Sequence, residues 1–209
     1  MTTSDDLRER LCRWGRSLFE RGLTGGSSGN ITVRTDTGFL ATPTNSCLGF
    51  LDPSALSELD PSGRHAAGPK PTKEVPLHMA FYEARPSAGA VVHLHSTYAT
   101  LLSCLADTDP DDAVPAVTPY VVMRVGRVPL LPYYAPGDAA IAPLIRGKAA
   151  SASAVLLGNH GPVVSGGTLE AAVFASEELE ETAKLAVLGR GHPLRLLDPA
   201  EIARLSVRG

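Results

Sequence analysis

The sequence predicts a single α/β domain, and three observations support this. A chain of 209 residues with 44% hydrophobic content can bury one sizeable core. Segments with helical spacing of apolar residues alternate along the chain with short β-branched runs that are typical of strands. The 20 glycines and 17 prolines are scattered, which indicates tight turns between short elements. We therefore expect residues 1–209 to form one domain.

Composition and charge exclude several classes of function. The net charge is only −3 and no basic block is present, so nucleic acid is not an expected partner. The apolar runs fall short of the roughly 18 residues that a membrane span needs, and the first residues are polar and acidic. Cys12, Cys47 and Cys104 are odd in number and widely spaced, which indicates reduced thiols. We expect a soluble, cytoplasmic protein.

The first elements bring a glycine-rich loop to the start of a sheet. A helix over residues 5–21 precedes the loop at 23–30, which leads into a strand at 31–34 and a partner strand at 39–42. The loop lacks Gly-Lys-Ser/Thr and enters a strand, which excludes a Walker-type loop. Its backbone N–H groups could hold a phosphate, but an ordinary glycine-rich connection explains the segment equally well.

A second helix is predicted from Lys73, with Thr72 as its cap and Pro76 tolerated in the first turn. Glu74 then lies at a helix N-terminus, where the helix dipole by itself favours an acidic residue. His78 follows one turn later. Because the HExxH pattern is absent, we interpret His78 as a packed histidine or as one that supports a metal ligand without binding the metal.

Two histidines alternate within the β-branched run at 91–95. In a strand, His93 and His95 leave the same face, while Leu94 points into apolar packing on the other. Two imidazoles side by side suit a divalent transition metal. Chance is the competing explanation, since six histidines would produce an HxH pattern in roughly one such chain in seven.

The rest of the chain supplies a third histidine. His160 lies between Asn159 and Gly161 in a tight turn, which projects its ring from the end of a sheet. Three imidazoles and the Glu74 carboxylate describe a catalytic Zn²⁺ site with one position open to substrate. The remaining predicted elements are helices at 97–105, 138–148, 168–188 and 198–206, strands at 154–157 and 163–164, and irregular or edge strands over 114–131.

Five segments resemble, in order, those of the class II aldolase/adducin family. They are Gly25-Gly26-Ser27-Ser28-Gly29-Asn30-Ile31-Thr32, Thr42-Pro43-Thr44-Asn45, Thr72-Lys73-Glu74, His93-Leu94-His95 and Gly158-Asn159-His160-Gly161. The resemblance implies a three-layer α/β/α sandwich with a mostly antiparallel central sheet, assembled as a homotetramer with active sites between subunits. It also implies a divalent metal, usually Zn²⁺ with Mn²⁺ or Co²⁺ as alternatives, on His93, His95 and His160.

The same resemblance implies roles for further residues. Glu74 looks like the catalytic acid/base, which can also ligate the metal. Tyr120 is similar in place to a tyrosine lent across the subunit interface, with Tyr133 and Tyr134 as alternatives. The residues implied to hold the substrate phosphate are Gly29, Asn30, Thr44, Asn45, Thr72 and Lys73.

Two positions depart from the usual aldolase pattern. Asn45 replaces a common glycine, and Lys73 stands beside Glu74 where a small polar or apolar residue is usual. Lys73 could simply be solvated or paired with Glu74, or it could serve a substrate with a second anionic group. The second interpretation favours family members that decarboxylate a phosphorylated sugar acid, 3-oxo-tetronate 4-phosphate. A fuculose- or ribulose-phosphate aldolase or epimerase, a dehydratase, and a non-enzymatic adducin-like module are the alternatives.

Overall fold

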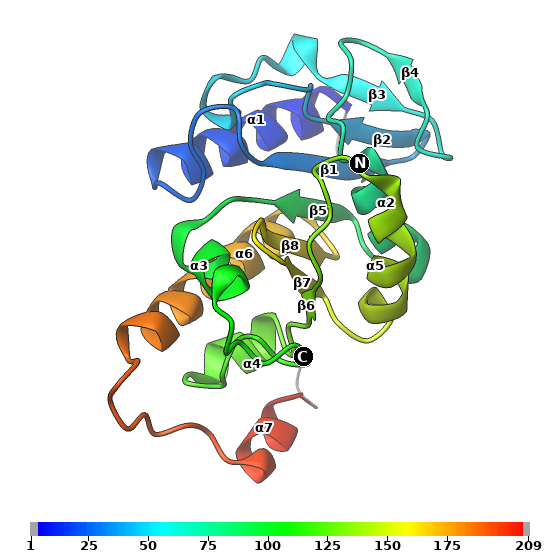
Figure 1. Cartoon of the computed structure of the whole chain (residues 1–209). Helices are drawn as coiled ribbons and strands as arrows, with labels where there is room; N and C mark the ends of the chain where they lie inside the picture. The colour runs from blue at the N-terminus through cyan, green and yellow to red at the C-terminus, as the bar shows by residue number, and fades with distance from the viewer. Residues whose placement is uncertain (1–3, 207–209) are drawn as a thin grey trace.

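A computed structural model describes residues 4–206, in which eight strands form one sheet (Figure 1). The strand order is β4-β3-β2-β1-β5-β8-β7-β6, and every neighbouring pair is antiparallel except β6 and β7. The strands are β1 (Asn30–Thr35), β2 (Gly38–Ala41), β3 (Ser57–Leu59), β4 (His65–Ala67), β5 (Ala90–His93), β6 (Leu130–Leu131), β7 (Ala154–Leu157) and β8 (Gly161–Gly166).

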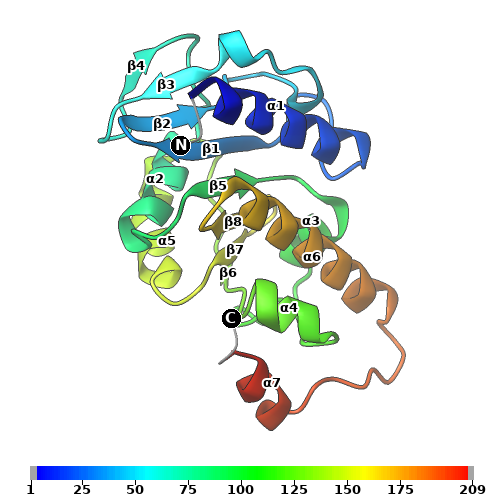
Figure 2. The same ribbon diagram turned by 180° about the vertical axis from the view of Figure 1, so that it is seen from behind.

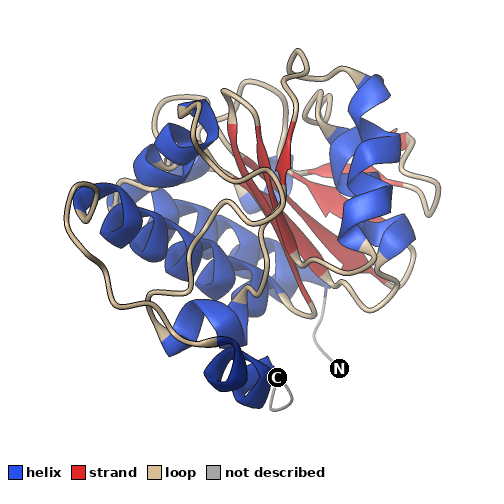
Figure 3. Cartoon of the chain, turned by 60° about the horizontal axis from the view of Figure 1, so that its bottom comes forward, coloured by secondary structure: helices blue, strands red, loops and turns tan. Residues whose placement is uncertain are grey.

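Helices cover both faces of this sheet. The α-helices are α1 (Ser4–Glu20), α2 (Val75–Ala84), α3 (Thr97–Cys104), α4 (Pro119–Arg124), α5 (Ala142–Ala149), α6 (Leu169–Leu188) and α7 (Pro199–Ser206). Short 3₁₀ turns lie at Leu48–Phe50, Pro53–Ala55 and Ala139–Ile141. Seen from behind, α1 and α6 lie across the sheet, and Figure 3 shows helices on either side of the strands (Figure 2, Figure 3).

Side chains alternate between two apolar layers along the central strands. On β5, Val91 packs in the layer that includes α2 and α5, whereas Val92 packs with α1 and α6. On β8, Val163 belongs to the first layer, and Val164 packs with α3 and α6. This two-residue period is the expected consequence of a pleated strand that is buried on both faces.

The structure confirms the predicted α/β class and the mostly antiparallel sheet, with corrections at three places. The strand predicted through His95 ends at His93. Residues 119–124 form helix α4 where strands were predicted, because Pro119 occupies its first turn, a position that proline favours. The helix predicted from Lys73 begins at Val75. Within residues 4–206, no helix has the length and apolar character needed to span a membrane.

The sheet register brings the predicted site residues together. Asn30 at the start of β1 pairs with His93 at the end of β5, and His93 in turn pairs with Val163 on β8. The glycine-rich loop before β1, the segment after β5 and the turn between β7 and β8 therefore meet at one end of the sheet.

Candidate metal centre and substrate pocket

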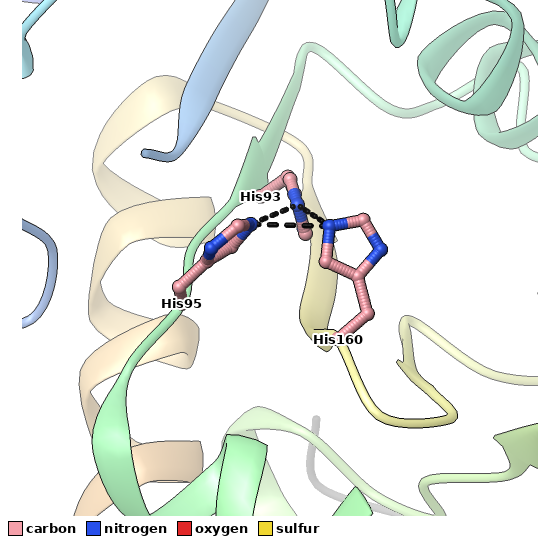
Figure 4. Close-up of side chains that lie close together, drawn as sticks. All are labelled: His93, His95 and His160. Carbon is pink, nitrogen blue, oxygen red and sulfur yellow. Dashed lines mark hydrogen bonds between the residues drawn. The ribbon is translucent and has the colours of Figure 1, made fainter. Parts of the chain in front are cut away.

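Three imidazole rings converge at this end of the sheet (Figure 4). The Nε2 atom of His93 lies 3.1 Å from that of His95 and 3.3 Å from that of His160, and the remaining pair is 3.1 Å apart. His93 ends β5, His95 follows two residues later, and His160 lies in the β7–β8 turn. The backbone of Asn159 has φ 52°, a left-handed conformation that asparagine tolerates and that turns the chain sharply before His160.

The tautomer of His93 is fixed by its surroundings. Its Nδ1–H donates to the carbonyl oxygen of Pro162 at 2.9 Å. The ring is completely buried, and this burial lowers the pKa of His93 to about 3, so the ring is neutral. Nε2 therefore carries a lone pair that points at the other two rings. A carbonyl that fixes the free nitrogen in this way is the usual support of a metal-ligating histidine.

Glu74 completes the cluster from the N-terminus of α2. Its Oε2 lies 3.4 Å from His93 Nε2, and its Oε1 lies 3.6 Å from His160 Nε2. Burial would raise the pKa of Glu74, but the hydrogen bond from Asn30 favours the ionised carboxylate, and the pKa lies below the ordinary value. Glu74 makes no side-chain cap to α2. The helix-dipole explanation is thus insufficient, because the carboxylate turns toward the histidines.

The four side chains fit a divalent metal. Ligands about 2.05 Å from a tetrahedral centre are separated by about 3.3 Å, which the three Nε2 separations approach. The lone pair of His93 faces an ionised carboxylate with no proton between them, and a cation relieves this conflict. Among the residues described, His93, His95 and His160 also form a group whose donor atoms can share one ion.

A cavity of about 260 Å³ opens beside the cluster. Its lining includes His95, His160 and Glu74. It also includes every residue predicted to bind phosphate, namely Gly29, Asn30, Thr44, Asn45, Thr72 and Lys73. Ser27, Ser28, Pro43 and Pro136 also line it. The two serines belong to the predicted loop, but nothing in the sequence connects Pro136 to a segment more than 60 residues away.

Backbone conformation explains two of the lining residues. Gly29 has φ +78°, and a β-carbon there would lie 2.8 Å from Thr24 Oγ1, so only glycine fits. Asn45 has φ 58°, which accounts for asparagine at a position where many aldolases have glycine. Thr72 accepts a hydrogen bond from the backbone N–H of Glu74 and so fixes the turn that precedes α2.

Lys73 is exposed at the rim of the cavity, with its side chain against Gly137. Among the ion pairs of the described residues, none joins Lys73 to Glu74. Burial is the main cause that lowers the pKa of His160, and the positive charge of Lys73 lowers it further. The Lys73–Glu74 pairing considered from the sequence is therefore absent among these ion pairs, and Lys73 lines the cavity together with Glu74 and His160.

The three candidate tyrosines lie in different places. Tyr120 on α4 is 57% exposed and lines a separate groove with Arg21 and Phe174. Tyr133 is 60% exposed. Tyr134 is half-buried and lines a narrow pocket with Glu74 and His160.

Comparison with known proteins places the chain in a family. The model of the class II aldolase and adducin N-terminal domain matches residues 9–187. The chain belongs to the class II aldolase/adducin family. The resemblance seen in the five sequence segments is thereby confirmed.

Several members of this family are close relatives. 3-oxo-tetronate 4-phosphate decarboxylase of Escherichia coli (strain K12) is 50% identical, over 95% of this chain and 94% of the relative. L-fuculose phosphate aldolase of the same strain is 33% identical, over 87% of this chain and 84% of the relative. The crystal structure of YgbL from Escherichia coli superposes with a TM-score of 0.94 at 48% identity, and the match covers 97% of this chain and 99% of that chain. The structure of an L-fuculose 1-phosphate aldolase gives a TM-score of 0.88 at 26% identity, and the match covers 99% of this chain and 97% of that chain.

Proposed function

We propose that this class II aldolase-family chain decarboxylates 3-oxo-tetronate 4-phosphate to dihydroxyacetone phosphate and CO₂. The observation that carries the proposal is Lys73. This cation lines the same pocket as the histidine cluster and the loop predicted to bind phosphate, an arrangement that suits a substrate with both a carboxylate and a phosphate. The 50% identity to a decarboxylase of this name supports it.

The metal-holding residues in this proposal are His93, His95, His160 and, before substrate binds, Glu74. Zn²⁺ is the metal we propose, since three imidazoles and a carboxylate suit it, with Mn²⁺ and Co²⁺ as alternatives. When bound, the cation supplies Lewis-acid stabilisation of the negative charge that develops on the substrate oxygens.

The protein residues position the substrate and move its protons. The backbone and side chains of the 27–30 and 43–45 loops hold the phosphate, while Lys73 orients the carboxylate that leaves. The C1–C2 bond breaks, CO₂ departs, and the electron pair forms the C2–C3 double bond of an enediolate. Glu74 manages the proton of the C2 hydroxyl or delivers a proton to carbon, which yields dihydroxyacetone phosphate.

Tyr120 is proposed to act on a neighbouring subunit. On its own subunit it lines a groove that contains none of the metal-cluster residues, so it can reach a site only across an interface. A homotetramer with active sites between subunits meets this requirement. Tyr134 is the alternative within one chain, because it already lines a pocket with Glu74 and His160.

The test is an assay of dihydroxyacetone phosphate release from 3-oxo-tetronate 4-phosphate, coupled to metal analysis of the purified protein. We expect turnover that depends on bound metal, with kcat reduced about 100-fold or more in Glu74→Gln. Lys73→Ala should lower kcat/KM. Unchanged turnover in Lys73→Ala would remove the role given to this lysine.

An aldolase acting on L-fuculose 1-phosphate is the second candidate, favoured by the 33% identity to such an enzyme. Both reactions need the same enediolate, so substrate comparison decides between them. Cleavage of L-fuculose 1-phosphate without decarboxylation of the sugar acid would establish the aldolase. Protein that binds no zinc, manganese or cobalt and turns over neither substrate would support an adducin-like module.

A further inference from the structure

His78 on α2 is completely buried, yet both of its ring nitrogens have polar partners. Nδ1 lies 2.9 Å from Thr32 Oγ1, and Nε2 lies 2.5 Å from Asn30 Oδ1. Asn30 and Thr32 alternate on β1, so both side chains leave the face of the sheet that α2 covers. Any buried imidazole needs partners, and these contacts alone are compatible with simple packing.

The hydrogen-bond donors in this network have one consistent assignment. The Asn30 Nδ2 group donates to Glu74 Oε2 at 2.8 Å, because an ionised carboxylate can only accept. Asn30 Oδ1 must then face His78 and accept from Nε2–H. Burial lowers the pKa of His78 to about 4, so the ring is neutral and Nδ1 has no proton. Nδ1 therefore accepts from the Thr32 hydroxyl.

Tyr82 completes the assignment. Its hydroxyl donates to the backbone carbonyl of Thr32 at 2.9 Å and lies 3.0 Å from Thr32 Oγ1. Because the unprotonated Nδ1 of His78 takes the Thr32 hydroxyl proton, Thr32 Oγ1 can only accept in its contact with Tyr82. The direction of each hydrogen bond from Thr32 through His78 and Asn30 to Glu74 is therefore determined.

The orientation of the Asn30 amide determines whether it attracts or repels the Glu74 carboxylate. If the Asn30 amide turned over, its oxygen would face Glu74 Oε2 and two acceptors would repel each other. The same helix anchors both ends of the amide, since the backbone N–H of His78 donates to the carbonyl of Glu74 at 3.2 Å. Asn30 is held between two groups that keep a fixed separation.

We propose that His78 is a positioning residue that keeps the Asn30 amide turned toward Glu74 and thereby holds this carboxylate beside His93 and His160. The proposal rests on the proposed function of the site. It explains why a polar ring occupies a core position of α2 whose neighbours Leu77 and Phe81 are apolar.

The experiment compares His78→Leu with His78→Gln. Leucine removes the donor, whereas the glutamine amide can still donate to Asn30 Oδ1. We expect kcat for decarboxylation to fall about tenfold or more in His78→Leu with KM little changed, and to recover largely in His78→Gln. In Co²⁺-loaded protein, the visible absorption spectrum of His78→Leu should differ from the wild-type spectrum, and that of His78→Gln should match it.

Phe81→Leu is the matched control for packing. It removes a buried ring from the same helix without touching the network, so it should lower the melting temperature and keep the wild-type kcat and Co²⁺ spectrum. Wild-type kcat and spectrum in His78→Leu would overturn the proposal, as would equal losses in both His78 variants and in Phe81→Leu. If wild-type protein lacks decarboxylase activity, the proposed function fails, and the Co²⁺ spectra alone decide the role of His78.

Discussion

Glu180 on α6 supports the segment that carries His95, and replacing it with glutamine tests how strongly. Its two carboxylate oxygens accept from the backbone N–H groups of Tyr98 and Ala99, each at 2.9 Å. Both N–H groups belong to the first turn of α3, and Ser96 at the cap position makes no side-chain cap of its own. A carboxylate from another helix therefore satisfies the N-terminus of α3.

The expected loss follows from these two bonds. A hydrogen bond to a charged group contributes about 1.5 to 3 kcal/mol, and the helix dipole adds to it. Glutamine keeps one neutral acceptor and turns its amide N–H groups toward the other donor. Glu180→Gln should therefore lower the free energy of unfolding by about 2 kcal/mol. Because α3 begins two residues after His95, zinc affinity should fall about tenfold.

Urea unfolding at pH 7.5 and fixed protein concentration measures the first effect, and competition with a chelating dye measures the second. Glu181→Gln is the control, because Glu181 is exposed and its replacement removes the same charge from the same helix. Its effect should stay within about 0.5 kcal/mol. Equal stability and zinc affinity in the two variants would refute the role given to Glu180.

Three further predictions concern stability and the metal. Glu170 accepts from Arg10 and from Trp14, and these bonds outweigh burial and lower its pKa. Glu170→Gln should therefore cost about 1 kcal/mol at neutral pH, and the difference from wild type should vanish as pH falls through the lowered pKa, as acid titration of unfolding can show. Gly29→Ala should lower the melting temperature and raise KM more than Gly26→Ala does. Both glycines have positive φ, but of the two only Gly29 has neighbours that a β-carbon would clash with. Equal effects of the two substitutions on melting temperature and KM would contradict this. Chelation should abolish turnover and lower the free energy of unfolding by about 2.7 kcal/mol relative to protein in metal at 100 times Kd, as paired denaturation curves can test.

The convergence of three histidines was predictable from the sequence because the local pattern around each one determines where its ring points. Alternation within a β-branched run put His93 and His95 on one face, and the turn around His160 projected its ring. The role of Pro136 was not predictable, because only the tertiary fold brings that loop to the glycine-rich segment. Helix α4 was missed because its short sequence centres on two consecutive valines, which favour strands, and the proline that starts it is also common in turns.

Hydrogen-bond networks were also beyond sequence reasoning. His78 could be interpreted as supporting a ligand, but its partner could not be identified, since Asn30 lies 48 residues earlier in the chain. Likewise, nothing near Ser96 indicates that a carboxylate 82 residues beyond Tyr98 caps α3. Contacts of this kind depend on how helices pack on the sheet, and the local pattern does not specify that packing.

The pairing of Asn30 with His93, and of His93 with Val163, has a consequence for how such a site can diversify. His93 sits on a strand paired on both sides, so its position changes only if the whole sheet changes. Several other residues that line the cavity sit on loops, at 27–29, at 43–45 and at Pro136, which can exchange side chains or lengthen without disturbing that pairing. Natural variation or directed evolution can therefore change the shape and charge of the cavity through these loops, while the arrangement of the three histidines stays the same.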